Sequence, residues 1–321
     1  MLTLLPKMLP LILLLLAGYV LYRTKLLDVA FNRQLSQVIL NVFYPCLIIY
    51  SILHNFTWET LLHNWVMPVG MVFILTTGWV VGLLTMPLLK RHPDNTKRCY
   101  HFVCMTNNYA FLPILMAASL WGEKAVALVV LSGLGSELCV WTFGIKSLTG
   151  QPLGRGSIRN IVSLPMIALL TSFVLLAVRS ACVSHGYVPA EGSLLAELFE
   201  NILLSCHIAG EATIPAAALI CGVRIAMIRP ERLLSPIVLG ASLLRVAVIP
   251  AICIGVLLLL PLEMEIRRVL ILLATMPVSM ASVTLAEAYR SDAEFSASAI
   301  LLTLLLCLIT TPLWLAIVGI S

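Results

Sequence analysis

An all-α integral membrane fold is predicted by three features of the sequence. Of its 321 residues, 60% are hydrophobic and only 11% are charged, whereas a soluble domain carries about 25% charged residues. Apolar runs recur along the whole chain, each close to the roughly 20 residues that a helix needs to cross a bilayer. Lysine and arginine concentrate in every second connection, which is typical of multi-pass membrane proteins. The expected solvent is therefore lipid, and no connection is long enough for a soluble domain.

Ten transmembrane helices are expected from the apolar runs. They lie near residues 4–22, 35–54, 66–89, 100–121, 124–149, 161–180, 196–222, 236–261, 268–289 and 296–319. The first run resembles a signal peptide in having Lys7 at its start. It lacks a small-residue cleavage site and is followed by a basic stop, so we interpret it as a helix. The boundary between the fourth and fifth runs rests on Gly122 and Glu123 alone.

Composition and motifs disfavour several kinds of function. The net charge of +5 does not indicate a nucleic-acid partner, because the basic residues are scattered through short connections. Nine cysteines lie mostly in apolar runs and form no C-x-x-C pair, so we expect neither a disulfide framework nor a metal site. No cofactor is predicted. An intramembrane enzyme is disfavoured because the chain has no H-E-x-x-H, G-x-S-G or G-x-G-D motif.

The distribution of basic residues predicts the orientation. The odd-numbered connections hold 14 lysines and arginines, the other side holds five, and Arg245 lies inside a run. Because cytoplasmic connections carry the excess of lysine and arginine, we expect the odd-numbered connections in the cytoplasm and both termini outside. The expected location is the cytoplasmic (inner) membrane, crossed many times.

The two halves of the chain echo each other at a spacing of about 168 residues. Residues 18–20 (Gly-Tyr-Val) recur at 186–188, and Pro45 lies two residues from register with Pro215. This spacing predicts two five-helix repeats and a short cytoplasmic connection, at residues 1–149, 161–321 and 150–160 respectively. Since five is an odd number, the second repeat must enter the membrane upside down. Inverted repeats are typical of secondary transporters, because exchanging the conformations of the halves converts an inward-open state into an outward-open one.

The fourth and ninth predicted helices each contain a proline near mid-membrane. Pro113 and Pro277 each remove a backbone donor and disturb the preceding turn. Such breaks survive in lipid only where they line a protein cavity or water, and a half-helix with a partly positive N-terminus follows each. Two such ends favour an anion, most naturally a carboxylate. The expected hydrogen-bonding groups are Asn107, Asn108, Thr275, Ser279 and Ser282. The alternative is that the prolines only kink packed helices and the hydroxyls bond to their own backbone.

Three ionisable residues fall deep inside predicted helices. Arg245 lies about ten residues, or roughly 14 Å, into the eighth helix, where a charge costs about 2.5–3.5 kcal/mol. Glu137 and Glu211 are expected at similar depth, with His207 one turn from Glu211 on the same face. Arg245 either contacts the anion or joins a charge relay, or it forms a structural pair with Glu137 or Glu211. For the two glutamates and for His207, a structural role is slightly or clearly favoured.

Four stretches of the chain resemble those of a known family. They are residues 41–45 (Asn-Val-Phe-Tyr-Pro), 107–113 (Asn-Asn-Tyr-Ala-Phe-Leu-Pro), 274–277 (Ala-Thr-Met-Pro) and 310–314 (Thr-Thr-Pro-Leu-Trp). In order and spacing the chain resembles the auxin efflux carrier family, in its short bacterial form, over essentially its whole length.

This resemblance implies ten helices in two inverted five-helix repeats, with broken helices 4 and 9 crossing at their prolines, here Pro113 and Pro277. The asparagine before the crossing is Asn107 or Asn108. It also implies a scaffold of helices 1, 2, 6 and 7 beside a moving unit, frequent dimers, and transport of organic anions such as malonate, malate or auxin. Two departures bear on auxin: the chain lacks the long cytosolic loop of the plant carriers, and it has no asparagine beside Pro277.

Together these patterns predict a secondary carrier that moves a small organic anion by alternating access. The expected partners are that anion, the lipid bilayer and a second copy of the chain in a homodimer. A sodium-coupled symporter of similar design, a channel and a sensor are the alternatives. Sodium sites need several convergent carboxylates or carbonyls, and the predicted midplane offers few.

The predicted orientation can be tested at the C-terminus. Because both termini are expected outside, an alkaline phosphatase fused after Ser321 should be active and a green fluorescent protein fused there should be dark. A bright fluorescent fusion would mean that the number of membrane crossings is odd.

Overall fold

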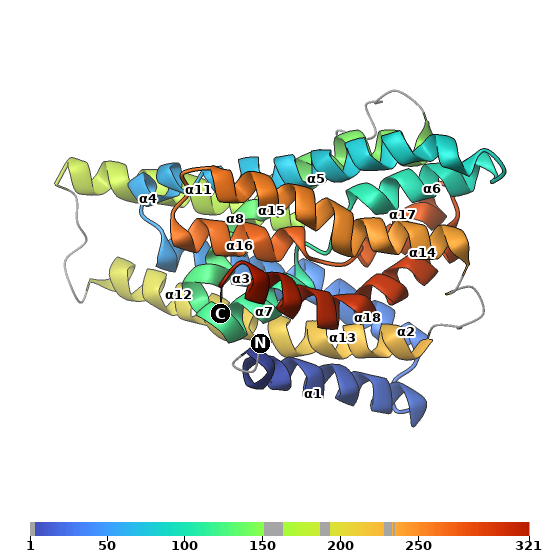
Figure 1. The fold of residues 1–321 in the computed structure, drawn as a ribbon. Coiled ribbons are helices and arrows are strands. Elements are labelled where there is room, and N and C mark those ends of the chain that lie inside the picture. The colour runs from blue at the N-terminus through green and yellow to red at the C-terminus, as the bar shows by residue number, and fades with distance from the viewer. Residues whose placement is uncertain (1–3, 151–162, 187–192, 228–232, 234, 321) are drawn as a thin grey trace.

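The fold is a bundle of helices that lie roughly side by side, with their connections gathered at the two ends (Figure 1). It is given by a computed structural model that describes residues 4–150, 163–186, 193–227, 233 and 235–320. Within these residues no strand occurs apart from one isolated bridge, so the all-α prediction is confirmed.

The helices cover all ten predicted ranges. In chain order they are α1 (Leu4–Arg23), α2 (Val29–Val38), η1 (Ile39–Phe43), α3 (Tyr44–Asn55), α4 (Trp58–His63), α5 (Val66–Thr85), η2 (Met86–Leu89), α6 (Asp94–Met105), α7 (Phe111–Trp121), α8 (Glu123–Cys139), η3 (Val140–Gly144), α9 (Ile145–Thr149), α11 (Leu164–Ser184), α12 (Leu194–Glu211), α13 (Thr213–Met227), α14 (Pro236–Leu243), η5 (Leu244–Val248), α15 (Ile249–Leu259), α16 (Met264–Ala274), α17 (Ala281–Ala288) and α18 (Ala293–Ile317). The short helix α4 was not predicted, since it is too short and too polar to show as an apolar run. A reciprocal capping box between Thr57 and Thr60 begins it.

Seven helical stretches in the described residues are long and apolar enough to cross a membrane. They are Val29–Asn55, Trp58–Leu89, Glu123–Thr149, Leu164–Ser184, Ala196–Met227, Pro236–Leu259 and Ala293–Ile317. Leu13–Arg23 and Phe111–Trp121 are shorter apolar helices. The chain is therefore a multi-pass membrane protein by the length and composition of its helices.

Residues at the helix ends show why the elements stop where they do. Asp28 begins α2, because its side chain accepts a hydrogen bond from the backbone N–H of Phe31 (2.7 Å). Asp292 serves the first turn of α18 in the same way, through Phe295 (2.9 Å). Gly122, with a φ of +78°, separates α7 from α8, so the boundary predicted there is confirmed.

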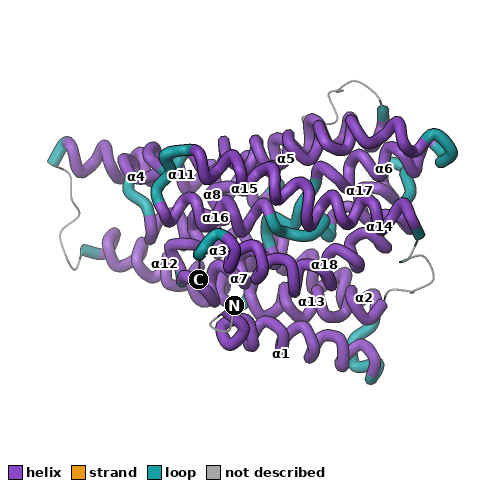
Figure 2. Tube along the Cα trace, in the orientation of Figure 1, coloured by secondary structure: helices purple, strands orange, loops and turns teal. Residues whose placement is uncertain are grey.

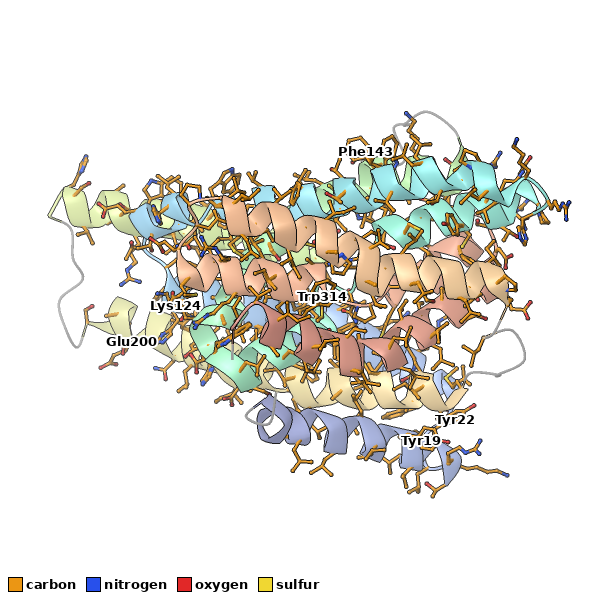
Figure 3. The ribbon with its side chains drawn as sticks, viewed as in Figure 1. Tyr19, Tyr22, Lys124, Phe143, Glu200 and Trp314 are labelled. Atoms are coloured by element: carbon orange, nitrogen blue, oxygen red, sulfur yellow. The ribbon has the colours of Figure 1, made fainter. Side chains whose placement is uncertain are left out.

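Close helix packing depends on glycines at two crossings. In α1, a side chain at Gly18 would collide with the backbone of Leu219 in α13, and one at Gly222 would collide with the backbone of Leu15. Helices in lipid gain little from apolar burial, so their association depends on such close backbone approach. This pair lies along one side of the bundle, and Figure 3 marks it by Tyr19 and Tyr22 of α1.

The helices pack in two groups. One group contains α1, α2–α3, α11 and α12–α13, and the other contains α5, α6, α8 and α14–α18. The groups meet where α3 packs on α8 and where α7 packs on α1 and α13. By contrast, α12 packs mainly on α3, η1 and α13, and apart from Gly210 none of its described side chains is buried.

The broken helices correct the predicted repeat spacing. The ends of α6 and α16 are 169 residues apart and the starts of α7 and α17 are 170 apart. Pro45 and Pro215 share the 170-residue spacing, so they are in register and the 168-residue match was one to two residues short. Gly186 follows the end of α11 whereas Gly18 lies inside α1, and residues 187 and 188 lie outside the described residues, as does most of the 150–160 connection.

Candidate functional site

Two helix breaks meet inside the bundle. The fourth predicted helix stops at the end of α6 and resumes as α7, and the ninth stops at the end of α16 and resumes as α17. Asn107 and Val278 form an isolated antiparallel bridge, and the backbone N–H of Asn108 donates to the carbonyl of Pro277 (2.7 Å). In Figure 2 non-helical segments are visible in the middle of the bundle. The two interruptions therefore pair with each other, as two short strands would.

The remaining backbone groups at the breaks are satisfied from α18 and from side chains. Thr303 Oγ1 accepts from the backbone N–H of Val278 (3.1 Å), and Thr311 Oγ1 donates to the carbonyl of Thr275 (3.3 Å). Asn107 Nδ2 donates to the carbonyl of Leu273 (2.7 Å). These bonds matter because backbone groups away from water must find partners inside the protein.

Arg245 binds the carboxyl ends of both broken helices. Its Nε donates to the carbonyl of Met276 (3.2 Å), Nη1 to Cys104 (3.4 Å) and Nη2 to Ala274 (2.9 Å). The side chain is fully buried. The C-terminal end of a helix carries unpaired carbonyls and a partial negative charge, so a guanidinium with five donors suits two such ends.

The predicted pair between Arg245 and a glutamate is wrong. Among the described residues Arg245 has no carboxylate partner, because carbonyl dipoles take that place. It lies in the π-helical turn η5, whose carbonyl at Val246 accepts from Trp314 Nε1 (3.0 Å). Trp314 is labelled in Figure 3. π-turns inside α-helices frequently mark functional positions.

Glu137 lies beside the first break and faces a cavity. Its Oε1 accepts from the hydroxyl of Tyr109 (2.9 Å), and its Oε2 accepts from Trp141 Nε1 (2.9 Å). The cavity has a volume of about 250 Å³ including its open side. Its lining residues are Tyr44, Ile48, Tyr109, Val130, Gly133, Glu137, Pro165, Met166 and Leu169. The cavity thus lies at the contact between the two helix groups, with α3 and α11 on one side and α8 on the other.

Glu211 belongs to a different environment. Its side chain is 68% exposed and pairs with His207 at 3.6 Å. The ring of His207 stacks on Tyr50 with centroids 4.1 Å apart. A similar depth along the helix therefore did not place Glu211 beside Glu137 or Arg245, and His207 has the structural role that was favoured for it.

The predicted hydrogen-bonding residues fall into two classes. Thr275 Oγ1 donates to the carbonyl of Leu272 (2.8 Å), so for this residue the alternative of bonding to its own backbone is correct. Ser282 Oγ lies 3.2 Å from Thr106 Oγ1, which links the two broken helices, and Ser279 Oγ accepts from the backbone N–H of Ala281 (3.3 Å). These three hydroxyls serve the protein itself.

Asn107 and Asn108 keep unused polar atoms. Asn107 Oδ1 and Asn108 Nδ2 are buried and have no hydrogen-bond partner within the described residues. The start of α7 has no side-chain cap either, so its first N–H groups and its partial positive charge remain available. Next to these groups, the crossing offers both donors and acceptors to a bound molecule or to water.

The prolines have unequal positions. Pro277 lies in the second break, and its carbonyl pairs with the first break. Pro113 instead lies in the first turn of α7, where a helix tolerates proline because no intrahelical donor is lost. The expectation that both helices cross at their prolines is therefore met by Pro277, while the first helix crosses at Asn107 and Asn108, five to six residues earlier.

Several residues of the site were not predicted. Tyr44 and Tyr109 lie within stretches already singled out for the family resemblance, but no role followed from their sequence position. Trp141 stands four residues after Glu137, the helical spacing at which side chains meet, so that contact could have been predicted. Thr303 and Thr311 gave no signal, because threonine is common in apolar helices and usually bonds to its own backbone.

Comparison with known proteins identifies the family. The chain matches the family described as membrane transport protein over residues 3–155 and 153–315. The chain belongs to this family. The resemblance to auxin efflux carriers is thereby confirmed, and membership in this family supports a transport role for the crossing and its cavity.

Two relatives are similar to this member of the family. An uncharacterized transporter, MJ1031, of Methanocaldococcus jannaschii is 24% identical over 293 residues, which cover 88% of each chain. Protein PIN-LIKES 1 of Arabidopsis thaliana is 22% identical over 157 residues, 43% of this chain and 32% of the plant protein. The match therefore spans about a third of the plant protein and nearly all of the archaeal one.

The role of Arg245 can be tested by the stability of the purified protein. Arg245→Gln removes donors from three buried carbonyls, and each abandoned acceptor costs about 1–3 kcal/mol, so Tm and folded yield should fall. Arg245→Lys should fall less, because it keeps the charge but not the planar fork. Adding Glu137→Gln or Glu211→Gln to Arg245→Gln should not restore Tm. Recovery in either double variant would revive the arginine–carboxylate pair.

Asn107 and Asn108 form a matched pair of variants. Asn108→Ala keeps the backbone bond to Pro277 and removes only an unpartnered side chain, so transport should be lost while Tm stays close to that of the wild type. Asn107→Ala removes a hydrogen bond to Leu273 and should lower stability by about 0.5–1.5 kcal/mol. Uptake into vesicles and Tm measure the two effects. Wild-type uptake by Asn108→Ala would place the binding site elsewhere.

Proposed function

We propose that this chain is a secondary carrier for a small organic carboxylate. The observation that carries the proposal is the meeting of two broken helices beside a cavity at the contact between two helix groups. Helix breaks at depth are tolerated where they line a cavity, and substrate sites of secondary transporters lie at such broken helices. Family membership supports transport, and the uncapped start of α7 with Asn108 beside it supports an anion.

The architecture proposed for this carrier is ten transmembrane helices in two inverted five-helix repeats. The equal spacing of the two breaks and of Pro45 and Pro215 supports it. The first group of helices, α1, α2–α3, α11 and α12–α13, corresponds to the scaffold that the family resemblance implies. The second group, with both breaks, corresponds to the moving unit. Alternating access then requires the cavity to open first to one side of the membrane and then to the other.

The location and assembly that we propose follow from the basic residues and the family. The carrier lies in the cytoplasmic membrane with both termini outside, because 14 lysines and arginines stand in the odd-numbered connections. A homodimer is proposed from the family resemblance alone, and the mass of the protein in lipid nanodiscs decides it. No catalytic role is proposed for any residue.

Counterflow in proteoliposomes tests the proposed function. Vesicles containing the purified protein are preloaded with unlabelled malonate, malate or indole-3-acetate and diluted into the same labelled acid. At least one acid should show saturable uptake above that of empty vesicles, and unlabelled choline should not compete. A channel gives no stimulation by internal substrate, and a sodium symporter loses uptake when potassium replaces sodium on both sides. Absence of counterflow with all three acids, together with competition by choline, would overturn the carboxylate proposal.

A further inference from the structure

The cavity beside the crossing contains a carboxylate and no basic side chain. Glu137 lines it together with Tyr44 and Tyr109, and both of its oxygens accept hydrogen bonds from neutral donors. An ionised Glu137 stabilised in this way repels a second carboxylate that enters the same cavity, because like charges interact strongly where water is scarce. An anion carrier with this cavity therefore has to change the charge of Glu137.

No other titratable group on the packed elements is placed to neutralise Glu137. The helices α5 and α7 carry none, and α16 carries its charged residues, Glu265, Arg267 and Arg268, only in its first five residues. Arg179 and Cys182 lie in the last turns of α11, far from the lining residues Pro165–Leu169, and Lys146 lies beyond η3 in α9. On α3 the groups are Tyr44, Cys46, Tyr50 and His54, of which only Tyr44 lines the cavity.

We propose that the Glu137 carboxyl is a proton-binding site, filled when the organic anion binds, so that anion and proton cross the membrane together. The inference rests on the proposed carrier function and adds its coupling ion. The carboxylate takes one proton from the aqueous side at which the anion enters. It returns that proton to water after the anion leaves on the other side.

The hydrogen bonds fix where the proton sits. Trp141 Nε1 can only donate, so it stays on Oε2 and the proton occupies Oε1. The hydroxyl of Tyr109, which donates to Oε1 when Glu137 is ionised, then accepts from the new O–H and turns its own hydrogen to the cavity. Tyr44, whose hydroxyl has no partner within the described residues, offers a second donor beside Gly133. Protonation thus removes a negative charge and supplies a donor to the anion.

The pH dependence of binding tests the proton site. The probe is labelled malonate, or labelled malate if malonate gives no counterflow, bound to the purified full-length chain between pH 7 and pH 8.5. If one proton binds with each anion, Kd should weaken by up to tenfold per pH unit. Glu137→Gln removes the titrating group, so its Kd should not change with pH. Glu137→Asp keeps a carboxyl and should retain the dependence, and so should the control Glu211→Gln, which changes a glutamate outside the cavity.

A second measurement needs no variant. Adding the same probe to the wild-type protein in weakly buffered solution should take up close to one proton per bound anion, measured with a pH-sensitive dye. A wild-type Kd that is independent of pH, or a Glu137→Gln protein that keeps the dependence, overturns the proton site while counterflow leaves the carrier intact. If none of the acids binds or exchanges, the carrier proposal fails and the proton site fails with it.

Discussion

Four helix ends meet in the middle of this bundle, and the backbone groups they leave unpaired govern the surrounding structure. Each end of an α-helix exposes up to four N–H or C=O groups, and in a membrane interior water does not serve them. The two breaks answer part of this demand by pairing with each other through Asn107, Asn108, Pro277 and Val278. Arg245 and the threonines of α18 answer the rest. Helices that are far apart in the chain are thus held together by backbone polarity as well as by apolar packing.

This solution separates the two buried charges. Arg245 is stabilised by carbonyl dipoles, and Glu137 is stabilised by the neutral donors Tyr109 and Trp141. In a buried ion pair, neutralising one member leaves the other uncompensated at a cost of about 3–5 kcal/mol. Here Glu137 can gain a proton without any loss of partners for Arg245. A carboxyl that changes charge during transport is therefore compatible with a permanent positive charge in the same group of helices.

The sequence predicted the breaks but not the partners that stabilise them. Pro277 and the small polar residues around it indicate an interruption because each weakens local helix bonding. The partners of Arg245 were missed because they are carbonyls, which every residue carries and no residue type signals. Depth along a helix likewise failed to separate Glu137 from Glu211, since depth gives no information on which face packs. The contact of Glu137 with Trp141 follows helical spacing, and it is the part of the site that sequence reasoning could have reached.

The division of the cavity between the two helix groups bears on how the proposed carrier works. Tyr109, Glu137 and Trp141 belong to the group that contains the breaks, whereas Tyr44 and the α11 residues belong to the other. A displacement of α8 against α3 would change the shape of the cavity and the distance to Tyr44. It would leave the hydrogen bonds of Glu137 intact, because both donors move with it. The charge-changing group and its donors would then travel as one unit with the anion, and only the opposite wall would be exchanged.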